Sequence, residues 1–244
     1  MNTYCADLHI HTVLSPCGDL EMSPVRIVDQ AAQKGLDIIA IADHNHTGHC
    51  RITREFGAKK GIWVVYGVEV TSREEVHCLA FFDTDEQVEL FQEYIDHFLP
   101  KIANDTSVFG QQLIVDENEN ILEELKHSLY PGISQGIEEI SEKVKHLGGY
   151  FVPAHIDRKV NGLYSQLGFF PLKLEVDAIE IFRNTKKDDI IREHKELEKY
   201  QMLVSSDAHF IEDIGRSYSK LKMREKSFVE LGKALHGLNG RMII

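Results

Sequence analysis

The chain has 244 residues, 43% of them hydrophobic, and its 39 acidic residues outnumber 27 Lys and Arg to give a net charge of −12. This apolar content is enough for a folded core and excludes a disordered chain. The acidic balance argues against binding to duplex DNA or to an anionic membrane, so we expect no duplex nucleic acid partner. Binding of a small phosphorylated ligand is not excluded, because a local metal or arginine cluster can outweigh the net charge.

The N-terminus and the cysteines predict a cytoplasmic protein. No basic leader with an apolar core stands before Asp7, and no apolar run approaches the ~18 residues of a membrane span. The four cysteines form no C-x-x-C pair, so reduced thiols are expected. Thirteen histidines are unusually many and give the first indication of function, whereas nothing in the sequence fixes the oligomeric state.

Short apolar runs predict seven strands, most of them buried on both faces as parallel strands are. The predicted strands cover residues 3–9, 37–42, 63–69, 76–82, 150–154, 178–181 and 203–206. Because helical patterns follow several of these runs, we predict an α/β fold with a parallel sheet, either open or closed into a barrel.

Capping residues mark the predicted helices. Ser23 as N-cap, Pro24 at the first helical position and Gly35 past the end delimit the first helix. A second helix is expected to begin at a Ser134 cap and to end at Gly148-Gly149. Residues 186–200 and 228–235 predict two more helices, the former exposed.

The segment at about 83–147 interrupts the alternation of strands and helices. It is acidic, carries an amphipathic stretch over 88–98, and offers a hairpin from Leu113–Val115 to Ile121–Leu122. We predict that this segment is an insertion or lid beside the main sheet, within a single domain over 1–244.

Side chains that bind metals stand at the ends of the predicted strands. They are His9, His11, His44, Glu69, His155, Asp207 and His209. Residues two apart on a strand share a face, and the carboxyl ends of parallel strands meet at one rim. His77 falls at the start of its strand, so it reaches this rim only if that strand is antiparallel or is entered from the site. Burying so many ionisable groups without a cation is costly, and we therefore predict a metal centre suited to Zn, Mn or Fe.

The order and context of these motifs resemble the PHP family, named for polymerase and histidinol phosphatase domains. The matching pieces are Asp7-Leu8-His9-Ile10-His11, Ala42-Asp43-His44, Gly67-Val68-Glu69, His77, Ala154-His155 and Ser206-Asp207-Ala208-His209. The resemblance implies a distorted seven-stranded, TIM-like (β/α)7 barrel that hydrolyses phosphoesters at a cluster of two or three divalent metal ions.

The resemblance also implies how the ligands are shared. One ion would be held by His9, His11, Glu69 and Asp207, and a second by Glu69, His77 and His155. A third would use His44, His209 and one ligand from the loop after the first strand, where Cys17 and Asp19 are the alternatives.

The expected function is hydrolysis of a phosphate ester of a small molecule, of the nucleotide or sugar phosphate class. A hydroxide bridging two cations would attack phosphorus, with Glu69 and Asp207 as catalytic residues. Arg158, Arg183 and Arg216 are the expected phosphate contacts. The alternatives are an amidohydrolase-like metal hydrolase and a non-catalytic accessory module stabilised by metal.

Other polar residues near the motifs are assigned lesser roles. Asp7 and Asp43 are expected to orient ligands rather than to bind metal themselves. His46 and His49 are expected to be solvated loop histidines.

Overall fold

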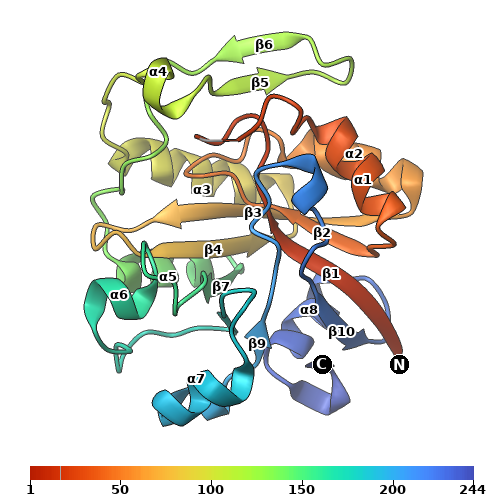
Figure 1. Ribbon diagram of the computed structural model, residues 1–244, viewed down its shortest axis with the longest axis vertical. Coiled ribbons are helices and arrows are strands. Elements are labelled where there is room, and N and C mark those ends of the chain that lie inside the picture. The colour runs from red at the N-terminus through yellow and green to blue at the C-terminus, as the bar shows by residue number, and fades with distance from the viewer. Residues whose placement is uncertain (17) are drawn as a thin grey trace.

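The structure is a computed structural model that describes residues 1–16 and 18–244, so the predicted ligand Cys17 lies outside the described residues. Its centre is a sheet with the strand order β11-β10-β1-β2-β3-β4-β7, which curls into a half-barrel (Figure 1). These strands are β1 (Asn2–Ile10), β2 (Ile38–Ile41), β3 (Trp63–Thr71), β4 (His77–Phe82), β7 (Tyr150–Pro153), β10 (Ser219–Met223) and β11 (Met242–Ile243). Two further pairs are β5 (Leu113–Val115) with β6 (Ile121–Glu124) and β8 (Ile179–Glu180) with β9 (Met202–Leu203).

The predicted helices form, but one cap is displaced and the helix expected over residues 186–200 is divided into an α-helix and a 3-10 turn. The helices are α1 (Pro24–Gln33), α2 (Cys50–Lys60), α3 (Asp85–Phe98), α4 (Thr106–Phe109), α5 (Ile137–His146), α6 (Leu163–Leu167), α7 (Lys187–Glu193) and α8 (Phe228–Leu235), with short 3-10 turns η1 (Lys195–Lys199), η2 (Ile211–Asp213) and η3 (Leu238–Gly240). Ser23 caps α1 by accepting a hydrogen bond from the backbone N–H of Arg26. Gly136 rather than Ser134 is the N-cap of α5.

The sheet is mixed, not parallel throughout. Strands β1, β2 and β3 are parallel, whereas β4 is antiparallel to both β3 and β7. Only residues 72–76 separate β3 from β4, too few for the crossover that a parallel pair needs. The (β/α)7 alternation expected from the resemblance is therefore interrupted by this hairpin. Strand β10, which was not predicted, pairs antiparallel with β1 and alternates buried and more exposed residues, unlike the continuous apolar runs.

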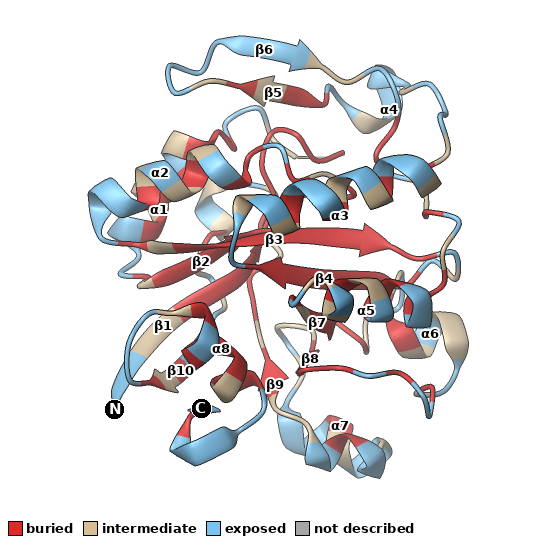
Figure 2. Ribbon diagram, turned by 180° about the vertical axis from the view of Figure 1, so that it is seen from behind, coloured by how far each residue is buried: buried red, intermediate tan, exposed pale blue. Residues whose placement is uncertain are grey.

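Alternation along the strands gives the sheet two buried faces. The outer face carries Val64, Tyr66 and Val68 of β3 and is covered by α1, α2, α3 and α5. The inner face carries Val65 of β3 and Leu79 of β4, which pack with α8. Because side chains alternate, Glu69 falls on the same face as Val65, and His77 on the same face as Leu79. The half-barrel thus holds an apolar inner core with polar groups at one end, and its strands are buried almost throughout (Figure 2).

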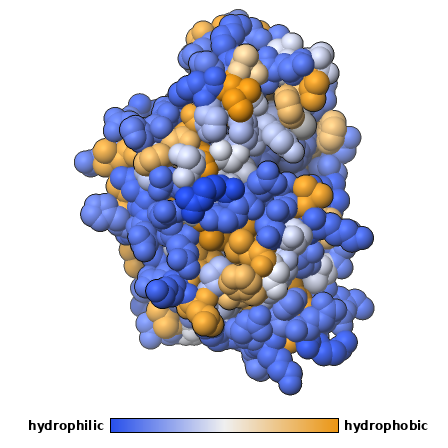
Figure 3. Space-filling view, turned by 90° about the vertical axis from the view of Figure 1, so that its left-hand side faces the viewer, coloured by the Kyte–Doolittle hydropathy of each residue, from blue (hydrophilic) through white to orange (hydrophobic). Residues whose placement is uncertain are grey.

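The segment between β4 and β7 contributes to the core at both of its ends. Phe91 of α3 and Ile140 of α5 belong to the outer core, while the β5–β6 hairpin stands apart at the top of the view in Figure 1. The face shown in Figure 3 is mainly hydrophilic, with hydrophobic side chains in separate groups. Among the described residues, no helix is both long enough and apolar enough to cross a lipid bilayer.

Candidate metal centre

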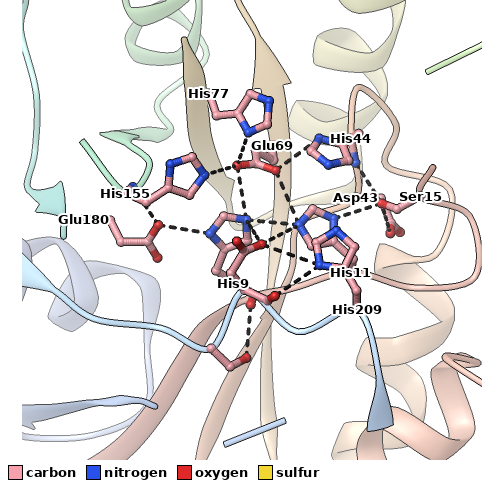
Figure 4. A network of polar contacts seen from close by, with 12 residues as sticks. His9, His11, Ser15, Asp43, His44, Glu69, His77, His155, Glu180 and His209 are labelled. Atoms are coloured by element: carbon pink, nitrogen blue, oxygen red, sulfur yellow. Dashed lines mark hydrogen bonds and ion pairs between the residues drawn. The ribbon is translucent and has the colours of Figure 1, made fainter. Parts of the chain in front are cut away.

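Five imidazoles converge on the carboxylate of Glu69, which β3 places on the inner face (Figure 4). Oε1 lies 2.9 Å from His77 Nδ1, 3.2 Å from His155 Nε2 and 3.3 Å from His9 Nε2. Oε2 lies 3.1 Å from His44 Nδ1 and 3.4 Å from His11 Nε2. His77 reaches this rim because its strand is antiparallel, one of the two arrangements that the sequence analysis required. As the first residue of β4, His77 pairs with Thr71 at the end of β3.

Asp207 faces the same group from the loop after β9. Its Oδ1 lies 3.3 Å from His11 Nε2 and 3.5 Å from His9 Nε2. His209, two residues further, stacks on the ring of His11 with centroids 4.2 Å apart. The structure therefore brings together all the predicted strand-end ligands, from elements spread over the length of the chain.

The protons on His9 and His11 follow from their outer partners. His9 Nδ1 lies 3.0 Å from Glu180 Oε2, and a carboxylate can only accept, so this nitrogen donates. Ser15 donates its hydroxyl proton to Asp43 Oδ1, so His11 Nδ1, 2.9 Å from Ser15 Oγ, must donate to it. When both rings are neutral, each Nε2 atom therefore carries a lone pair. The two Nε2 atoms lie 3.1 Å apart.

This donor set fits a metal ion. When both rings are neutral, their Nε2 lone pairs share their space with oxygens of Glu69 and Asp207, so acceptors face acceptors in a buried site. Among the described residues, no hydrogen bond satisfies Glu69 Oε2 or the Nδ1 atoms of His77 and His155. Unpaired buried acceptors are costly, and a cation between them removes that cost. Imidazole nitrogens with carboxylate oxygens suit Zn, Mn or Fe.

Three groups of ligand atoms each lie within 4.8 Å of one another. They are His9 with His11 and Glu69, His44 with Glu69 and His77, and His11 with His44 and His209. The first group matches the first predicted ion. The other two differ from the expected division, because His44 also groups with Glu69 and His77, and His11 joins His44 and His209.

Asp19, one of the two alternatives for the loop ligand, lies beside His209 through its backbone. Its N–H donates to the carbonyl of His209 at 3.0 Å. Its Oδ1 accepts from the N–H of Glu21 at 2.8 Å.

The charge state of the centre follows from burial and from neighbouring charges. Burial lowers the pKa of His11 to about 3, so this ring stays neutral. Burial also opposes charge on His9, but Glu69, Glu180 and Asp207 outweigh it and hold the pKa of His9 well above its ordinary value. Burial would raise the pKa of Glu69, yet the surrounding histidines outweigh it and hold that pKa well below the usual range. The centre thus holds anionic carboxylates that attract a positive charge.

Behind His11 stands a polar network that the sequence indicated only in part. Asp43 accepts from the N–H and the hydroxyl of Thr12 and from Ser15, at 2.6, 2.8 and 2.8 Å. Burial raises the pKa of Asp43 to about 6, which leaves it ionised at neutral pH. Its role as a group that orients a ligand, through Ser15 and His11, is consistent with these contacts.

The expectation that His49 is solvated is wrong. His49 is fully buried, because the β5–β6 hairpin covers it. Its Nε2 accepts from the N–H of Val115 at 3.0 Å, and its Nδ1 lies 2.6 Å from Thr12 Oγ1. A sequence of three histidines in one loop gives no sign that a hairpin more than sixty residues later will cover one of them.

The three predicted arginines occupy different positions. Arg158 reaches the centre, with Nη1 2.7 Å from Asp207 Oδ2. Arg183 lies near enough to Arg158, Arg216 and Asp207 for their charges to act on it, and burial lowers its pKa. Arg216 instead holds the loop of Asp207, since it donates to the carbonyl of Ser206 at 3.0 and 3.2 Å and pairs with Asp213.

Two ligand-bearing residues have backbones in the left-handed region, at φ 27° for His155 and φ 52° for Asp207. Non-glycine residues rarely adopt this conformation, and such positions concentrate at functional sites. Both residues follow the ends of buried strands, where the chain turns sharply toward the centre.

Comparison with known proteins places the chain in a family. The family model described as PHP domain matches residues 7–223. The uncharacterised protein YqxK of Bacillus subtilis is 25% identical over the whole chain, which spans 65% of that relative. A putative metal-dependent phosphoesterase from Bifidobacterium adolescentis has a TM-score of 0.57 at 22% identity, covering 87% of this chain and 91% of its own.

The lesion-specific endonuclease PfuEndoQ from Pyrococcus furiosus has a similar fold, with a TM-score of 0.74 at 22% identity, over 99% of this chain and 58% of its own. Endonuclease Q in complex with a 27-mer duplex that carries an abasic lesion matches equally well, with a TM-score of 0.73. The chain thus spans less than two thirds of YqxK and of this endonuclease.

The expectation that excluded duplex nucleic acid is therefore wrong. A fold that covers nearly all of this chain is seen bound to duplex DNA in endonuclease Q. The reasoning used the net charge of −12, which does not report the charge at a particular site, and Arg158 and Arg183 both lie near Asp207. With the family model matching residues 7–223 and the predicted ligands gathered around Glu69, the chain belongs to the PHP-domain family of metal-dependent phosphoesterases.

Proposed function

We propose that this protein hydrolyses a phosphodiester bond of a nucleic acid, with divalent metal ions bound around Glu69. The observation that carries the proposal is the contact of one buried carboxylate with five imidazoles. Such a set is costly to bury for stability alone and is suited to holding more than one cation. The fold similarity to an endonuclease over 99% of the chain supports nucleic acid as the substrate class.

The proposed metal ligands are the eight residues that meet at this rim, together with the loop after β1. They are His9, His11, His44, Glu69, His77, His155, Asp207 and His209, with Cys17 or Asp19 as the loop ligand. Glu69 and Asp207 are the proposed catalytic carboxylates. Divalent cations in such a site activate water as a nucleophile and neutralise phosphoryl oxygens.

Arg158 is the proposed phosphate contact. Its guanidinium is 41% exposed and bonded to Asp207, so it can turn toward a phosphate without crossing the core. A planar guanidinium binds two phosphate oxygens at once, which orients the phosphorus toward the centre. Arg183 would add charge at the same edge, whereas the contacts of Arg216 favour a role in holding residue 206.

We propose further that residues 1–244 form one PHP domain in which segment 83–147 is an insertion. In support, Phe91 and Ile140 from the two ends of this segment pack in the outer core with β3 and β4. The β5–β6 hairpin is the part that leaves the sheet, and it covers His49 at the back of the centre.

A panel of substrates tests the proposed function. Protein stripped of metal and reloaded with Mn²⁺ or Zn²⁺ is incubated with single-stranded and duplex oligonucleotides, intact or abasic, and with bis(p-nitrophenyl) phosphate, p-nitrophenyl phosphate and an amide. We expect metal-dependent cleavage of the oligonucleotides and of the diester, abolished by Asp207→Asn.

Two other results would contradict the proposal. Turnover of the monoester or of the amide alone would assign a different bond. Metal binding without turnover, with Asp207→Asn lowering only the melting temperature, would indicate an accessory module.

A further inference from the structure

Glu180 is a buried carboxylate to which the sequence analysis gave no role. It ends β8, within an otherwise apolar run, and its side chain is 3% exposed. Strand β8 pairs with β9 rather than with the seven-stranded sheet, so Glu180 approaches the centre from the side on which that sheet is open. A carboxyl group so deeply buried requires specific partners.

One oxygen of Glu180 meets two ligand-bearing elements. Oε2 lies 3.0 Å from His9 Nδ1 on β1 and accepts from the backbone N–H of His155 at 3.0 Å (Figure 4). The carbonyl of Glu180 also accepts from the N–H of Ile156 at 2.9 Å. Glu180 therefore connects β1 to the turn after β7, two elements that are not neighbours in the sheet.

Each contact has a consequence for the centre. Because the carboxylate only accepts, it keeps the proton of His9 on Nδ1 and leaves Nε2 free toward His11, Glu69 and Asp207. The bond to the N–H of His155 supports a residue whose φ is 27°, and this turn directs His155 Nε2 to Glu69.

We propose that Glu180 is a positioning residue of the metal centre, which fixes the tautomer of His9 and the backbone of His155. Outer partners of metal-binding histidines set ring orientation and basicity, and their loss costs 10–100-fold in metal affinity. The inference rests on the metal binding proposed above, and the experiment below separates the two.

Asp177, three residues before Glu180 and just ahead of β8, provides a matched control. It is also a buried carboxylate that accepts from a backbone N–H of β7, that of Phe151 at 2.7 Å, and contacts an imidazole, His236 Nε2, at 2.8 Å. His236 lies outside the cluster. Each of the two carboxylates thus accepts from one backbone N–H and contacts one imidazole, but only Glu180 contacts the metal centre.

The test compares Glu180→Leu and Asp177→Leu for Mn²⁺ and Zn²⁺ affinity, by chelator competition, and for thermal unfolding without metal. We expect both variants to lose stability, and only Glu180→Leu to lose about 10–100-fold in affinity. Glu180→Gln, whose amide oxygen can accept both bonds, should fold and lose less than about tenfold. Wild-type affinity in Glu180→Leu, or an equal loss in Asp177→Leu, would overturn the proposal.

A readout without metal keeps the inference testable if the Leu variant does not fold. Long-range ¹H–¹⁵N spectra of metal-free protein, followed with rising pH until His9 is neutral, report the tautomer of this ring. We expect the Nδ1–H form in the wild type and in Glu180→Gln, and loss of that preference in Glu180→Leu or Glu180→Ala. An unchanged tautomer in the alanine variant would refute the role of Glu180, whereas a wild type that binds neither metal would refute the proposed function alone.

Discussion

The two sides of the metal centre are supported in different ways. On the β1–β2 side, the polar side-chain atoms of Thr12, Ser15, Asp43 and His49 all have hydrogen-bond partners, and the β5–β6 hairpin covers His49. On the β7–β9 side, His155 Nδ1 and Glu180 Oε1 have none among the described residues. Arg158 on that side is 41% exposed. We infer a fixed support on the first side and, at the exposed Arg158, an entry for substrate on the second.

Glu69→Gln should have the largest effect, because this carboxylate serves both sides. Replacing it removes a charge from five imidazoles at once. We expect metal affinity to fall by more than about 100-fold and turnover to be lost. This is a larger loss of affinity than the one expected when a residue that only supports a metal ligand is replaced. Metal content by mass spectrometry and diester hydrolysis measure this. Full metal content in Glu69→Gln would contradict the arrangement around Glu69.

Asp43→Asn probes the β1–β2 side alone. The amide has one acceptor oxygen and a nitrogen that only donates, so it cannot accept all three hydrogen bonds that the carboxylate accepts. Ser15 and His11 then lose their fixed orientation. We expect a 10–100-fold loss of metal affinity and a loss of about 1–3 kcal/mol in the free energy of unfolding. Chelator competition and urea unfolding measure the two effects.

Ser15→Ala is the control for Asp43→Asn. It removes the link between Asp43 and His11 but leaves the bonds from Thr12 to Asp43 in place. We expect a smaller loss of stability than in Asp43→Asn, together with a clear loss of metal affinity. A stability loss without any change in affinity, in both variants, would reduce this network to a structural role.

The difference between the sides also decides what the sequence could predict. His9 and Glu69 lie near the carboxyl ends of β1 and β3, and His11 and His44 follow β1 and β2. Period-two alternation, and the meeting of the carboxyl ends of parallel strands at one rim, were enough to group these four residues. His77 needed one more fact, the direction of β4, which the five residues before it could have supplied. The predicted ligand residues are local features of strand ends, and local patterns were enough to predict that they gather at one rim.

The supporting residues depend on contacts between distant segments. Glu180 was missed because one acid in a short apolar run resembles an ordinary strand residue. Only the approach of β8 to β1 and to the turn after β7 gives its carboxylate partners. His49 was misplaced because its cover comes from Val115. The exclusion of duplex DNA failed for a related reason, since net charge says nothing about where the arginines gather.

Arg158→Lys tests whether the β7–β9 side is the open one. Lysine keeps the charge but loses the planar pair of donors. We expect KM for the diester to rise about tenfold, the equivalent of one charge-assisted hydrogen bond, with metal content unchanged. Arg192→Lys, on exposed α7 and paired with Asp189, is the control and should behave as wild type. An unchanged KM in Arg158→Lys would move the substrate path elsewhere.

His49→Asn and His49→Gln should have the smallest effects and sharpen the comparison most. Asparagine places an amide nitrogen near the Nδ1 position and keeps the bond to Thr12, whereas glutamine places an oxygen near Nε2 and keeps the bond from Val115. The asparagine variant leaves the Val115 N–H unpaired, which costs about 1–3 kcal/mol, whereas Thr12 in the glutamine variant still accepts from Leu14, at a cost of about 1 kcal/mol.

Amide exchange at Val115 distinguishes the two His49 variants. We expect this N–H to exchange faster in His49→Asn than in the wild type, and to stay protected in His49→Gln, while metal affinity changes by no more than a few-fold in either. The reason is that Asp43 keeps its bonds to Thr12 and Ser15 in both variants, so His11 keeps its proton on Nδ1. A loss of metal affinity as large as that of Asp43→Asn would instead make the hairpin part of the support for the metal centre, and the β1–β2 side would then depend on the insertion for its function as well as for its cover.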